Sequence, residues 1–415
     1  MAISNAQFVM RNEKTTDLSI RRSVDLKYLA GEEIKNFSPL TPYSDEVCNF
    51  LNDFSSELLK DFRYREFPDA ATVAFFSRKG NIQRLKKNFV DENFRLGKGL
   101  AFHITPSNIP VQFMFSYFFG LLAGNANVVR VASKNYPQVD FLCEILNKIL
   151  MRDEYKKIRE MTAIVRYDRE SDWTKIFSAK CHVRLIWGGD STIENIRKIP
   201  IPPRATELVF ADRYSFAIID ENSVENLNDA ELNRLAQNFY NDTYLVDQNA
   251  CSSPHLILWK SSKNFQGREK FWTAVEKIVH EKYDFPPIKA TTKYTNFCQN
   301  AIDFPQTEKL FKHDNFLYRV KVSAPFKGIE NLRGKFGLFY ENNFSSWEDW
   351  LEIINEKFQT LTYFGFNSKI LAQEVVKNNW LGIDRIIPIG RALDIGIFWD
   401  GYDLIGQMSR IIYTE

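Results

Sequence analysis

The sequence predicts an α/β fold assembled around parallel sheets. From Leu100 onward, short apolar runs alternate with amphipathic helical stretches, which is the pattern of βαβ units. The chain has 415 residues and is 44% hydrophobic, so it can bury a sizeable core and should divide into two or three domains. The alternation resumes after a proline-rich break, which predicts two α/β regions with a ligand in the cleft between them.

Charge, cysteine content and apolar runs exclude several classes of protein. The 54 Lys and Arg residues and 52 Asp and Glu residues are scattered singly, so we expect no nucleic-acid partner and no anionic membrane surface. The five cysteines are widely spaced without a C-x-x-C pair, which argues against a disulfide framework and a metal site. MAISNAQFVMRNEKTTD lacks the features of a secretory signal. The longest apolar stretch, 109–123, is interrupted and shorter than the roughly 20 residues of a membrane span. We expect a soluble, cytoplasmic protein.

Apolar spacing and turn residues predict the elements of the first half. In SDEVCNFLNDFSSELLKDF the apolar side chains recur at helical spacing, so this stretch forms a helix in a covering layer. Beyond it we expect, in order, strand LAFHI, a helix from Pro110 through Phe119 that stops at Gly124-Asn125, strand NVVRVA, a helix from Pro137 to Leu150, strand TAIVRY, a helix across Trp173 to Phe177, and strand HVRLIW.

The prolines of IPIPPRA mark the crossing into a second α/β region, where the same alternation is less regular. We expect strands ELVF and SFAIID, helix ELNRLAQNFYNDTYLV, strand SPHLILW, helices REKFWTAVEKIVHEKY and WEDWLEIINEKFQT, and strands LTYFGF and RIIPIG.

Cys251 stands at a loop-to-strand junction in VDQNACSSPHLILW. A lone cysteine beside an apolar strand is most often a small buried hydrophobe. The polar residues around it indicate another role, because a nucleophilic thiol needs both access and nearby donors. His255 follows four residues later, which in an extended strand is roughly 13 Å. We therefore expect His255 to be structural and not the partner base of Cys251.

Two further stretches combine a strand end with a helix start. In ITPSNIP, Asn108 precedes Pro110, and helix capping is the ordinary explanation for that asparagine. In LIWGGDSTIENIR, Gly188 and Gly189 separate a strand from a helix, where a phosphate could approach backbone N–H groups. A double glycine is also common in tight turns, and no G-x-G-x-x-G is present.

Taken together and in this order, ITPSNIP, LLAGNANVVRVAS, IWGGDST and DQNACSSP resemble motifs of the aldehyde dehydrogenase superfamily. KFQTLTYFG and DRIIPIGRALDIGIFWDGYDLIGQMSR are similar to its acyl-CoA reductase branch of the bacterial luminescence, or fatty acid reductase, type. The resemblance covers roughly residues 97–415. It implies an aldehyde dehydrogenase-like α/β fold with a Rossmann-type cofactor domain, an α/β catalytic domain and a small oligomerisation element. We assign residues 1–207, joined by 391–415, to the N-terminal layer and cofactor domain, and residues 208–390 to the catalytic domain.

The resemblance also implies roles for single residues. Cys251 would take the acyl group from an acyl-CoA or acyl-protein thioester, and Asn108 with the Cys251 backbone N–H would bind the oxyanion. Hydride from a nicotinamide cofactor would then release an aldehyde. The nucleotide site would be lined by Arg130, Gly188, Gly189 and Ser191, with Arg130 where the family usually has lysine. A homo-oligomer is expected, and an acyl-transferring or aldehyde-accepting partner enzyme is compatible with this chemistry.

Three departures from the family pattern affect the cofactor and the base. NAD-preferring relatives have an acid shortly after the lysine position, whereas this chain has Ser133 and Lys134, so we predict NADPH with NADH as the alternative. Glu207 in TELVF matches the family's catalytic glutamate or is a strand-edge carboxylate, and the sequence leaves both open. Phe336 marks the nicotinamide-ribose side of the site, but RGKFG lacks the glutamate that usually precedes it.

Three functions therefore compete. The first is NADPH-dependent reduction of an acyl thioester to an aldehyde through Cys251. The second is aldehyde oxidation, in which Glu207 activates water. The third is a noncatalytic scaffold within an acyl-transfer complex.

Overall fold

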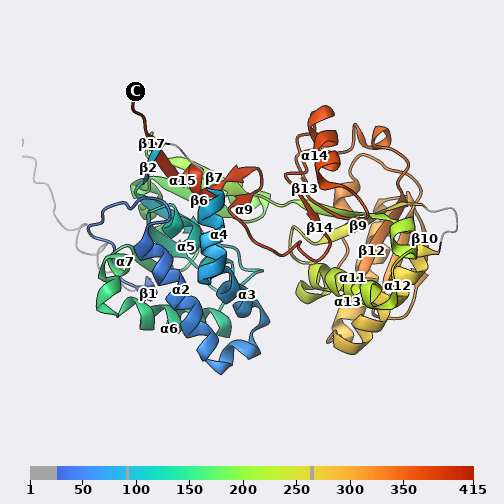
Figure 1. Cartoon of the computed structure of the whole chain (residues 1–415), viewed down its shortest axis with the longest axis horizontal. Coiled ribbons are helices and arrows are strands. Elements are labelled where there is room, and N and C mark those ends of the chain that lie inside the picture. The colour runs from blue at the N-terminus through green and yellow to red at the C-terminus, as the bar shows by residue number, and fades with distance from the viewer. Residues whose placement is uncertain (1–25, 90–92, 262–265) are drawn as a thin grey trace, which may run out of the picture. The chain divides into compact units, whose positions relative to one another are not determined.

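The computed structural model describes residues 26–89, 93–261 and 266–415. The stretch MAISNAQFVMRNEKTTD, expected not to be a signal, lies outside them. The chain divides into two compact units, Met1–Ala211 with Asp403–Glu415, and Asp212–Tyr402 (Figure 1). Each contains a largely parallel sheet with helices packed on it, which confirms the predicted α/β fold class. Among the described residues, no helix combines the length and apolar character needed to cross a bilayer.

The first unit is built on a six-stranded sheet of order β1-β5-β4-β3-β6-β7. All neighbouring strands run parallel except β1, which pairs antiparallel with β5. The central strands are buried on both faces and therefore read as continuous apolar runs. The strands are β1 (Lys27–Gly31), β3 (Leu100–Ile104), β4 (Ala126–Arg130), β5 (Thr162–Arg166), β6 (Val183–Trp187) and β7 (Thr206–Phe210).

The helices of the first unit pack on this sheet or on one another. Every residue of α5 is buried, and its C-terminus passes through Gly124 in the left-handed conformation predicted for that glycine. The helices are α2 (Asp45–Lys60), α3 (Pro68–Ser77), α4 (Lys79–Asn88), α5 (Gln112–Leu122), α6 (Pro137–Leu150), α7 (Lys156–Glu160), α8 (Trp173–Lys180), α9 (Asp190–Arg197) and α15 (Leu404–Met408). The chain returns to this unit at its C-terminal end, where β17 (Ser409–Ile412) pairs antiparallel with β2 (Phe94–Gly97).

The second unit has a seven-stranded sheet of order β10-β11-β12-β9-β8-β13-β14, parallel except for β10. Its strands are β8 (Tyr214–Asp220), β9 (Pro254–Lys260), β10 (Thr307–Lys312), β11 (Tyr318–Val322), β12 (Leu338–Asn343), β13 (Phe358–Phe364) and β14 (Arg385–Pro388), followed by the short pair β15 (Phe398–Trp399) and β16 (Tyr402–Asp403). Its helices are α10 (Glu221–Glu225), α11 (Asp229–Thr243), α12 (Gly267–Lys282), α13 (Pro287–Asp303) and α14 (Ser368–Lys377). One apolar cluster includes residues of α11 and α12, and another packs on the opposite face of the central strands.

The helix predicted for WEDWLEIINEKFQT is wrong. Only a 3-10 turn, Trp347–Trp350, forms there, and the last three residues of that stretch, FQT, begin strand β13. Trp350, Ile353 and Ile354 are buried in an apolar cluster on one face of the sheet. Apolar side chains at helical spacing are thus buried here without forming a helix. Pairing of β13 with both β8 and β14 outweighs the local helical preference.

The C-terminal boundary of the second unit also differs from the predicted one. Residues 391–402 lie in the second unit and not with residues 1–207. Arg385 donates to the carbonyl of Ala392 at 2.7 Å, and Asp242 accepts from the backbone N–H groups of Gly390 and Ala392 at 2.6 and 2.8 Å. These polar contacts hold the segment after β14 against β14 itself and against helix α11 of the same unit.

Candidate active site

In the first unit, three predicted segments follow neighbouring strands at one edge of the sheet. The loop after β3 carries Asn108, the segment after β4 carries Ser133 and Lys134, and the turn after β6 carries Gly188 and Gly189. Strand β3 lies between β4 and β6, and all three run parallel. Their carboxyl ends therefore meet, and the chain order reverses around β3, which is where open α/β sheets bind ligands.

Asn108 is not the helix cap that would explain it most simply. Helix α5 begins at Gln112 with Val111 as its N-cap, and no side chain caps it. Asn108 lies in the preceding loop and is exposed. Tyr136 anchors this loop, because its hydroxyl donates to the carbonyl of Ser107 at 2.7 Å. The loop that carries Asn108 is therefore held in place, and the Asn108 side-chain amide does not cap the helix.

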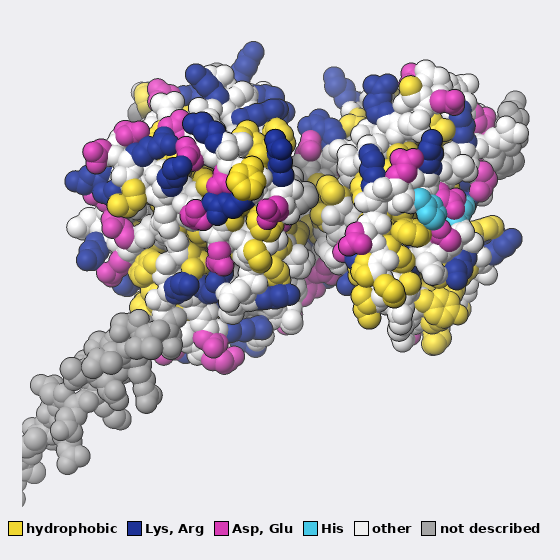
Figure 2. Space-filling model, turned by 90° about the horizontal axis from the view of Figure 1, so that it is seen from below, with side chains coloured by type: hydrophobic (Ala, Val, Ile, Leu, Met, Phe, Trp, Pro, Cys, Tyr) yellow, Lys and Arg dark blue, Asp and Glu magenta, His cyan; other side chains and the backbone are white. Residues whose placement is uncertain are grey.

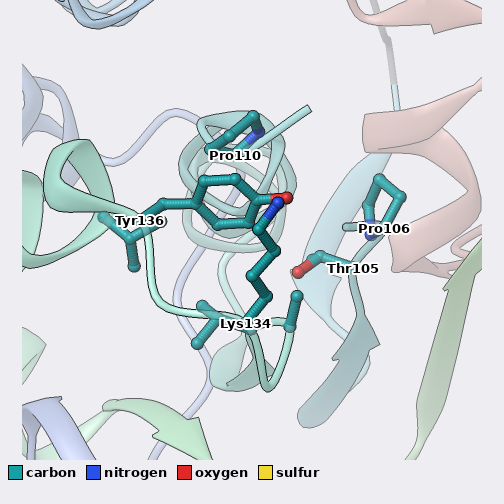
Figure 3. Close-up of a pocket in the computed structure, with 8 residues that line it drawn as sticks. Thr105, Pro106, Pro110, Lys134 and Tyr136 are labelled. Carbon is teal, nitrogen blue, oxygen red and sulfur yellow. The ribbon is translucent and has the colours of Figure 1, made fainter. Parts of the chain in front are cut away.

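A small hollow lies between the segments after β3 and β4 (Figure 3). Figure 3 shows Lys134 and Tyr136 side by side, with Thr105 and Pro106 facing them and Pro110 nearby. The Lys134 Nζ lies 4.9 Å from the centroid of the Tyr136 ring. The hollow therefore combines a cation, a hydroxyl and apolar walls. Its lining residues are Thr105, Pro106, Pro110, Val131, Ala132, Lys134, Tyr136 and Val139.

Arg130 and Ser133 both contact Tyr167. The Arg130 guanidinium carbon lies 5.0 Å from the Tyr167 ring centroid, and the Ser133 hydroxyl donates to the Tyr167 carbonyl at 3.3 Å. The Arg130 Nε is buried and makes no hydrogen bond with any described residue. A buried donor without an acceptor is costly, so an acceptor from a ligand would satisfy it.

The turn after β6 leaves its backbone open. Gly189 is the N-cap of α9 with φ of −70°, which any residue adopts, and a Cβ there would meet nothing within 4 Å. A Cβ on Gly188 would only touch the Thr192 side chain at 3.4 Å. Neither backbone conformation nor packing demands glycine here. Two glycines and the exposed Ser191 therefore leave the positive end of the helix accessible to an anion.

Glu207 lies on β7 opposite Arg184 of β6, near the amino ends of the parallel strands. The turn that follows Trp187 is roughly three residues further along, or about 10 Å. The carboxylate accepts from Arg184 Nε at 2.7 Å and from Arg197 Nε at 2.8 Å. The Arg184 side chain is only 3% exposed. This geometry favours the strand-edge alternative for Glu207, as the partner of a buried arginine.

In the second unit, Cys251 belongs to a tightly held turn before β9, at the amino edge of the sheet. Asp247 and Gln248 both adopt left-handed backbone conformations, with φ of 55° and 57°. The buried Gln248 amide accepts from Gly337 N at 2.8 Å and donates to the Leu338 carbonyl at 3.1 Å, which joins the turn to the start of β12. The Ser215 hydroxyl donates to the Cys251 carbonyl at 2.6 Å. The cysteine backbone is therefore fixed from neighbouring strands.

The Cys251 thiol is half-buried in a polar cluster. The Gln359 Nε2 lies 3.4 Å from Sγ and also donates to Asp400, which lies near Arg213. Burial raises the pKa of the Cys251 thiol to about 11, and the Asp400 carboxylate raises it further, while Gln359 and Arg213 oppose the rise. The thiol is therefore almost entirely protonated at pH 7 without substrate.

His255 has the structural role expected of it. It is buried, its ring stacks on Tyr214 at 5.6 Å between centroids, and its Nδ1 accepts from Gly334 N at 3.3 Å. Burial and the Arg333 charge lower the pKa of the imidazole to about 3, so it is neutral. Phe336 lies nearby before β12 in a left-handed conformation, and its carbonyl accepts from Lys293 at 2.9 Å.

The other cysteines have different surroundings. Cys143 and Cys181 are buried, and burial raises the pKa of their thiols to about 12 and about 11. Cys48 and Cys298 are half-buried on helices α2 and α13. Among the described residues, Cys251 is the one cysteine that lies in a turn at the amino edge of a sheet with a side-chain amide donating to its sulfur.

Residues 27–331, more than half of the chain, match the sequence profile of the family described as Acyl-CoA reductase (LuxC). The chain belongs to the LuxC family. It is 24% identical over 235 residues to a long-chain acyl-protein thioester reductase of Vibrio harveyi. That match covers 56% of this chain but only 42% of the length of the relative.

Solved structures show that this LuxC-family chain has the aldehyde dehydrogenase fold. A glyceraldehyde-3-phosphate dehydrogenase of Methanocaldococcus jannaschii complexed with NADP superposes with a TM-score of 0.62 and 16% identity, over 93% of this chain and 97% of that one. A benzaldehyde dehydrogenase of Corynebacterium glutamicum, described as NAD-dependent, gives a TM-score of 0.58 and 13% identity, over 90% and 85% of the two chains. At these identities the likeness concerns the fold alone.

In this LuxC-family chain, several residues that the sequence predicts for the site lie at neighbouring strand ends of the first unit. Asn108, Ser133 and Gly188 belong to adjoining strand ends of one unit, whereas Glu207 does not. In the other unit, Gln359 and Asp400 adjoin Cys251 but were not selected. Gln359 falls within WEDWLEIINEKFQT, which the sequence predicts to be a helix, so no local signal indicated its place at the start of β13.

Proposed function

We propose that this protein reduces an acyl thioester, acyl-CoA or acyl-protein, to an aldehyde through an acyl group bound to Cys251, with NADPH as reductant. Membership of the LuxC family carries the proposal, and the Vibrio harveyi relative, a long-chain acyl-protein thioester reductase, agrees with it. The placement of Cys251 in a fixed turn supports the assignment of the nucleophile.

Cys251 supplies the nucleophile. Its thiolate attacks the carbonyl carbon of the thioester, a new C–S bond forms, and the original carrier leaves as its own thiolate. Because burial raises the pKa of the Cys251 thiol to about 11, the attacking form is scarce and strongly nucleophilic. Asn108, whose amide is not engaged as a helix cap, would donate to the oxyanion at that carbon together with the Cys251 backbone N–H.

The first unit fits a dinucleotide. The open turn at Gly188 and Gly189 accommodates phosphate near the start of α9, and the unsatisfied Arg130 Nε offers a buried donor. Ser133 and Lys134 supply a hydroxyl and a cation where an acid would repel a 2′-phosphate, which supports NADPH over NADH. Phe336 would hold the nicotinamide side. When bound, the cofactor supplies hydride to the acyl carbon.

Reduction in this direction consumes no water and needs no base to activate one. Aldehyde oxidation would need such a base, and its only proposed candidate, Glu207, is engaged by Arg184 and Arg197. The ion pairs of Glu207 thus support reduction over the oxidative alternative.

Acyl transfer can be tested by incubating the protein with acyl-CoA esters of several chain lengths and measuring intact mass. We expect a mass increase of one acyl group, absent in Cys251→Ala and retained in the matched control Cys298→Ala, which is also half-buried. Adding NADPH should remove the adduct and release aldehyde. Absence of any adduct in the wild type across chain lengths would refute the proposal.

Cofactor preference has a separate test. The ratio of kcat/KM for NADPH to that for NADH should exceed one in the wild type and fall at least about tenfold in Lys134→Glu, because a carboxylate repels the 2′-phosphate. A wild type that uses NADH better would reject the NADPH assignment while leaving the acyl chemistry intact.

A homo-oligomer and a partner enzyme that supplies the acyl group or accepts the aldehyde complete the proposal, together with a cytoplasmic location. Figure 2 shows positive and negative side chains interspersed over the displayed face of each unit, in keeping with an expected absence of polyanionic partners. Sedimentation of the purified protein would test oligomerisation directly.

A further inference from the structure

The Cys251 sulfur has a side-chain hydrogen-bond donor that belongs to a distant strand. Gln359, the second residue of β13, places its Nε2 3.4 Å from Sγ, and the same nitrogen donates to Asp400 Oδ1. Gln359 is 1% exposed and the Asp400 side chain 3% exposed. A sulfur accepts weakly as a thiol, but it accepts strongly once it carries charge.

Asp400 determines which end of the Gln359 amide faces the sulfur. An ionised carboxylate only accepts, so the NH₂ group of Gln359 must point toward it. The amide oxygen points elsewhere and accepts from the Thr360 hydroxyl at 3.3 Å. If the amide were turned over, two buried acceptors would face each other. The NH₂ group therefore has one hydrogen for Asp400 and one for Sγ.

The position of Asp400 is itself held. Asp400 and Gly401 both adopt left-handed conformations, with φ of 49° and 75°, in the turn between β15 and β16. Arg213 NH1 lies 3.7 Å from Asp400 Oδ1, and Arg213 also pairs with Asp384 and donates to the Phe358 carbonyl at 2.9 Å. The chain of contacts thus runs from Arg213 through Asp400 and Gln359 to Cys251.

We propose, on the basis of the function proposed above, that Gln359 is a further catalytic residue, which stabilises the Cys251 thiolate by its side-chain N–H, and that Asp400 is a positioning residue which orients that amide. The stabilisation acts twice. The thiolate is the attacking group in acylation. After reduction, the C–S bond of the thiohemiacetal breaks, the sulfur leaves with the electron pair, the C=O bond forms, and the hydroxyl proton is released to solvent.

Charge and orientation act on the thiol in opposite directions. The negative charge of Asp400 raises the pKa of the Cys251 thiol, whereas the Gln359 hydrogen bond that it orients lowers that pKa. Burial raises the pKa of Asp400 itself to about 6, so this carboxylate is mostly ionised at neutral pH. The charged groups that act on the sulfur are Asp400, Arg213, Asp212 and Arg385.

The hydrogen bond can be tested without substrate by the rate of Cys251 alkylation with iodoacetamide between pH 7 and 9, followed by peptide mass spectrometry. Gln359→Met keeps the volume and removes the donor. A rise of about one unit in thiol pKa leaves tenfold less thiolate, partly offset by its greater nucleophilicity, so alkylation should slow about three- to fourfold. Gln359→Glu also adds charge and should slow it about tenfold. Unchanged rates in both variants would overturn the proposal.

Two substitutions at Asp400 separate charge from orientation, and both tolerate a left-handed backbone. Asp400→Asn removes the charge but keeps an oxygen to accept from Gln359, so alkylation should become about threefold faster than in the wild type. Asp400→Gly removes the charge and the acceptor together, so alkylation of Cys251 in this variant should be about threefold slower than in Asp400→Asn. Equal rates in the two variants would reject the positioning role.

Controls separate this inference from the function on which it rests. Circular dichroism and thermal unfolding test whether each variant is folded. If Gln359→Met does not fold, the alkylation rate of Gln359→Glu provides the test of the hydrogen bond. Acylation of wild-type Cys251 together with unchanged alkylation in the Gln359 variants would reject only the inference. Slowed alkylation in those variants without wild-type acylation would reject the proposed function, and the catalytic role of Gln359 with it.

Discussion

Replacing Glu207 by alanine should destabilise the first unit and should not abolish thioester reduction. The carboxylate accepts from Arg184 and from Arg197, and Arg184 lies almost wholly inside the unit with a side chain 3% exposed. Removing Glu207 leaves the buried guanidinium without its countercharge. Within the described part of the chain, the Ser178 hydroxyl at 3.2 Å and the Ile199 carbonyl at 2.8 Å are the acceptors that remain for Arg184.

The expected cost follows from these contacts. Removing one partner of a fully buried ion pair costs about 3–5 kcal/mol. Glu207 retains some solvent contact, with a side chain 16% exposed, and Arg184 keeps two neutral acceptors, so we expect about 2–3 kcal/mol. With a urea dependence of about 2 kcal/mol per molar, the midpoint should fall by about 1–1.5 M. Glu207→Gln keeps one acceptor and the same shape, so its cost should be smaller.

The assay combines urea unfolding, followed by circular dichroism, with the rate of aldehyde formation under native conditions. We expect Glu207→Ala to lower the unfolding midpoint while the folded fraction still reduces acyl-CoA at a rate within a few-fold of wild type. A variant that unfolds like wild type but loses more than about a hundredfold in rate would refute this reasoning, because that pattern indicates a general base or another catalytic group.

Three further predictions concern pH, a buried carboxyl and the cofactor turn. The rate of Cys251 acylation should rise nearly tenfold per pH unit between pH 7 and 9, because a thiol pKa of about 11 keeps the thiolate fraction proportional to the hydroxide concentration. A rate measured by stopped flow that stays constant from pH 7 upward would contradict this. Burial raises the pKa of Asp242 to about 7, so the stability that its protonated form contributes is fully present below about pH 4 and is lost as pH rises to about 7. In urea unfolding, the wild type should therefore lose stability relative to Asp242→Asn between these pH values. Parallel curves of stability against pH would exclude this contribution of Asp242. Gly189→Asp should weaken NADPH binding more than about tenfold in a fluorescence titration, because the new carboxylate places negative charge where the phosphate would lie. The Tm should change little, since a side chain at this position has space. An unchanged affinity would show that the turn is not part of the cofactor site.

Local patterns were sufficient for much of the fold. Helix α6 spans Pro137–Leu150 as predicted, because a proline at its start and apolar residues at helical spacing are signals within the segment itself. Strand β3 likewise matches LAFHI. The apolar spacing of residues 347–360 was equally helical, but sheet pairing and burial of Trp350 determined another structure. A period within one segment cannot report which neighbours that segment will have.

The sequence by itself determined the fold class, the family motifs and the identity of the candidate nucleophile, because apolar periodicity and short motifs are carried by residues close in the chain. Only the tertiary structure decided that Asn108 is not a helix cap, that Glu207 pairs with Arg184, and that Gln359 reaches the sulfur of Cys251. Gln359 and Cys251 are 108 positions apart. Parallel strands bring such residues together at one edge of a sheet, and strand order is a property of the whole fold that no single segment encodes.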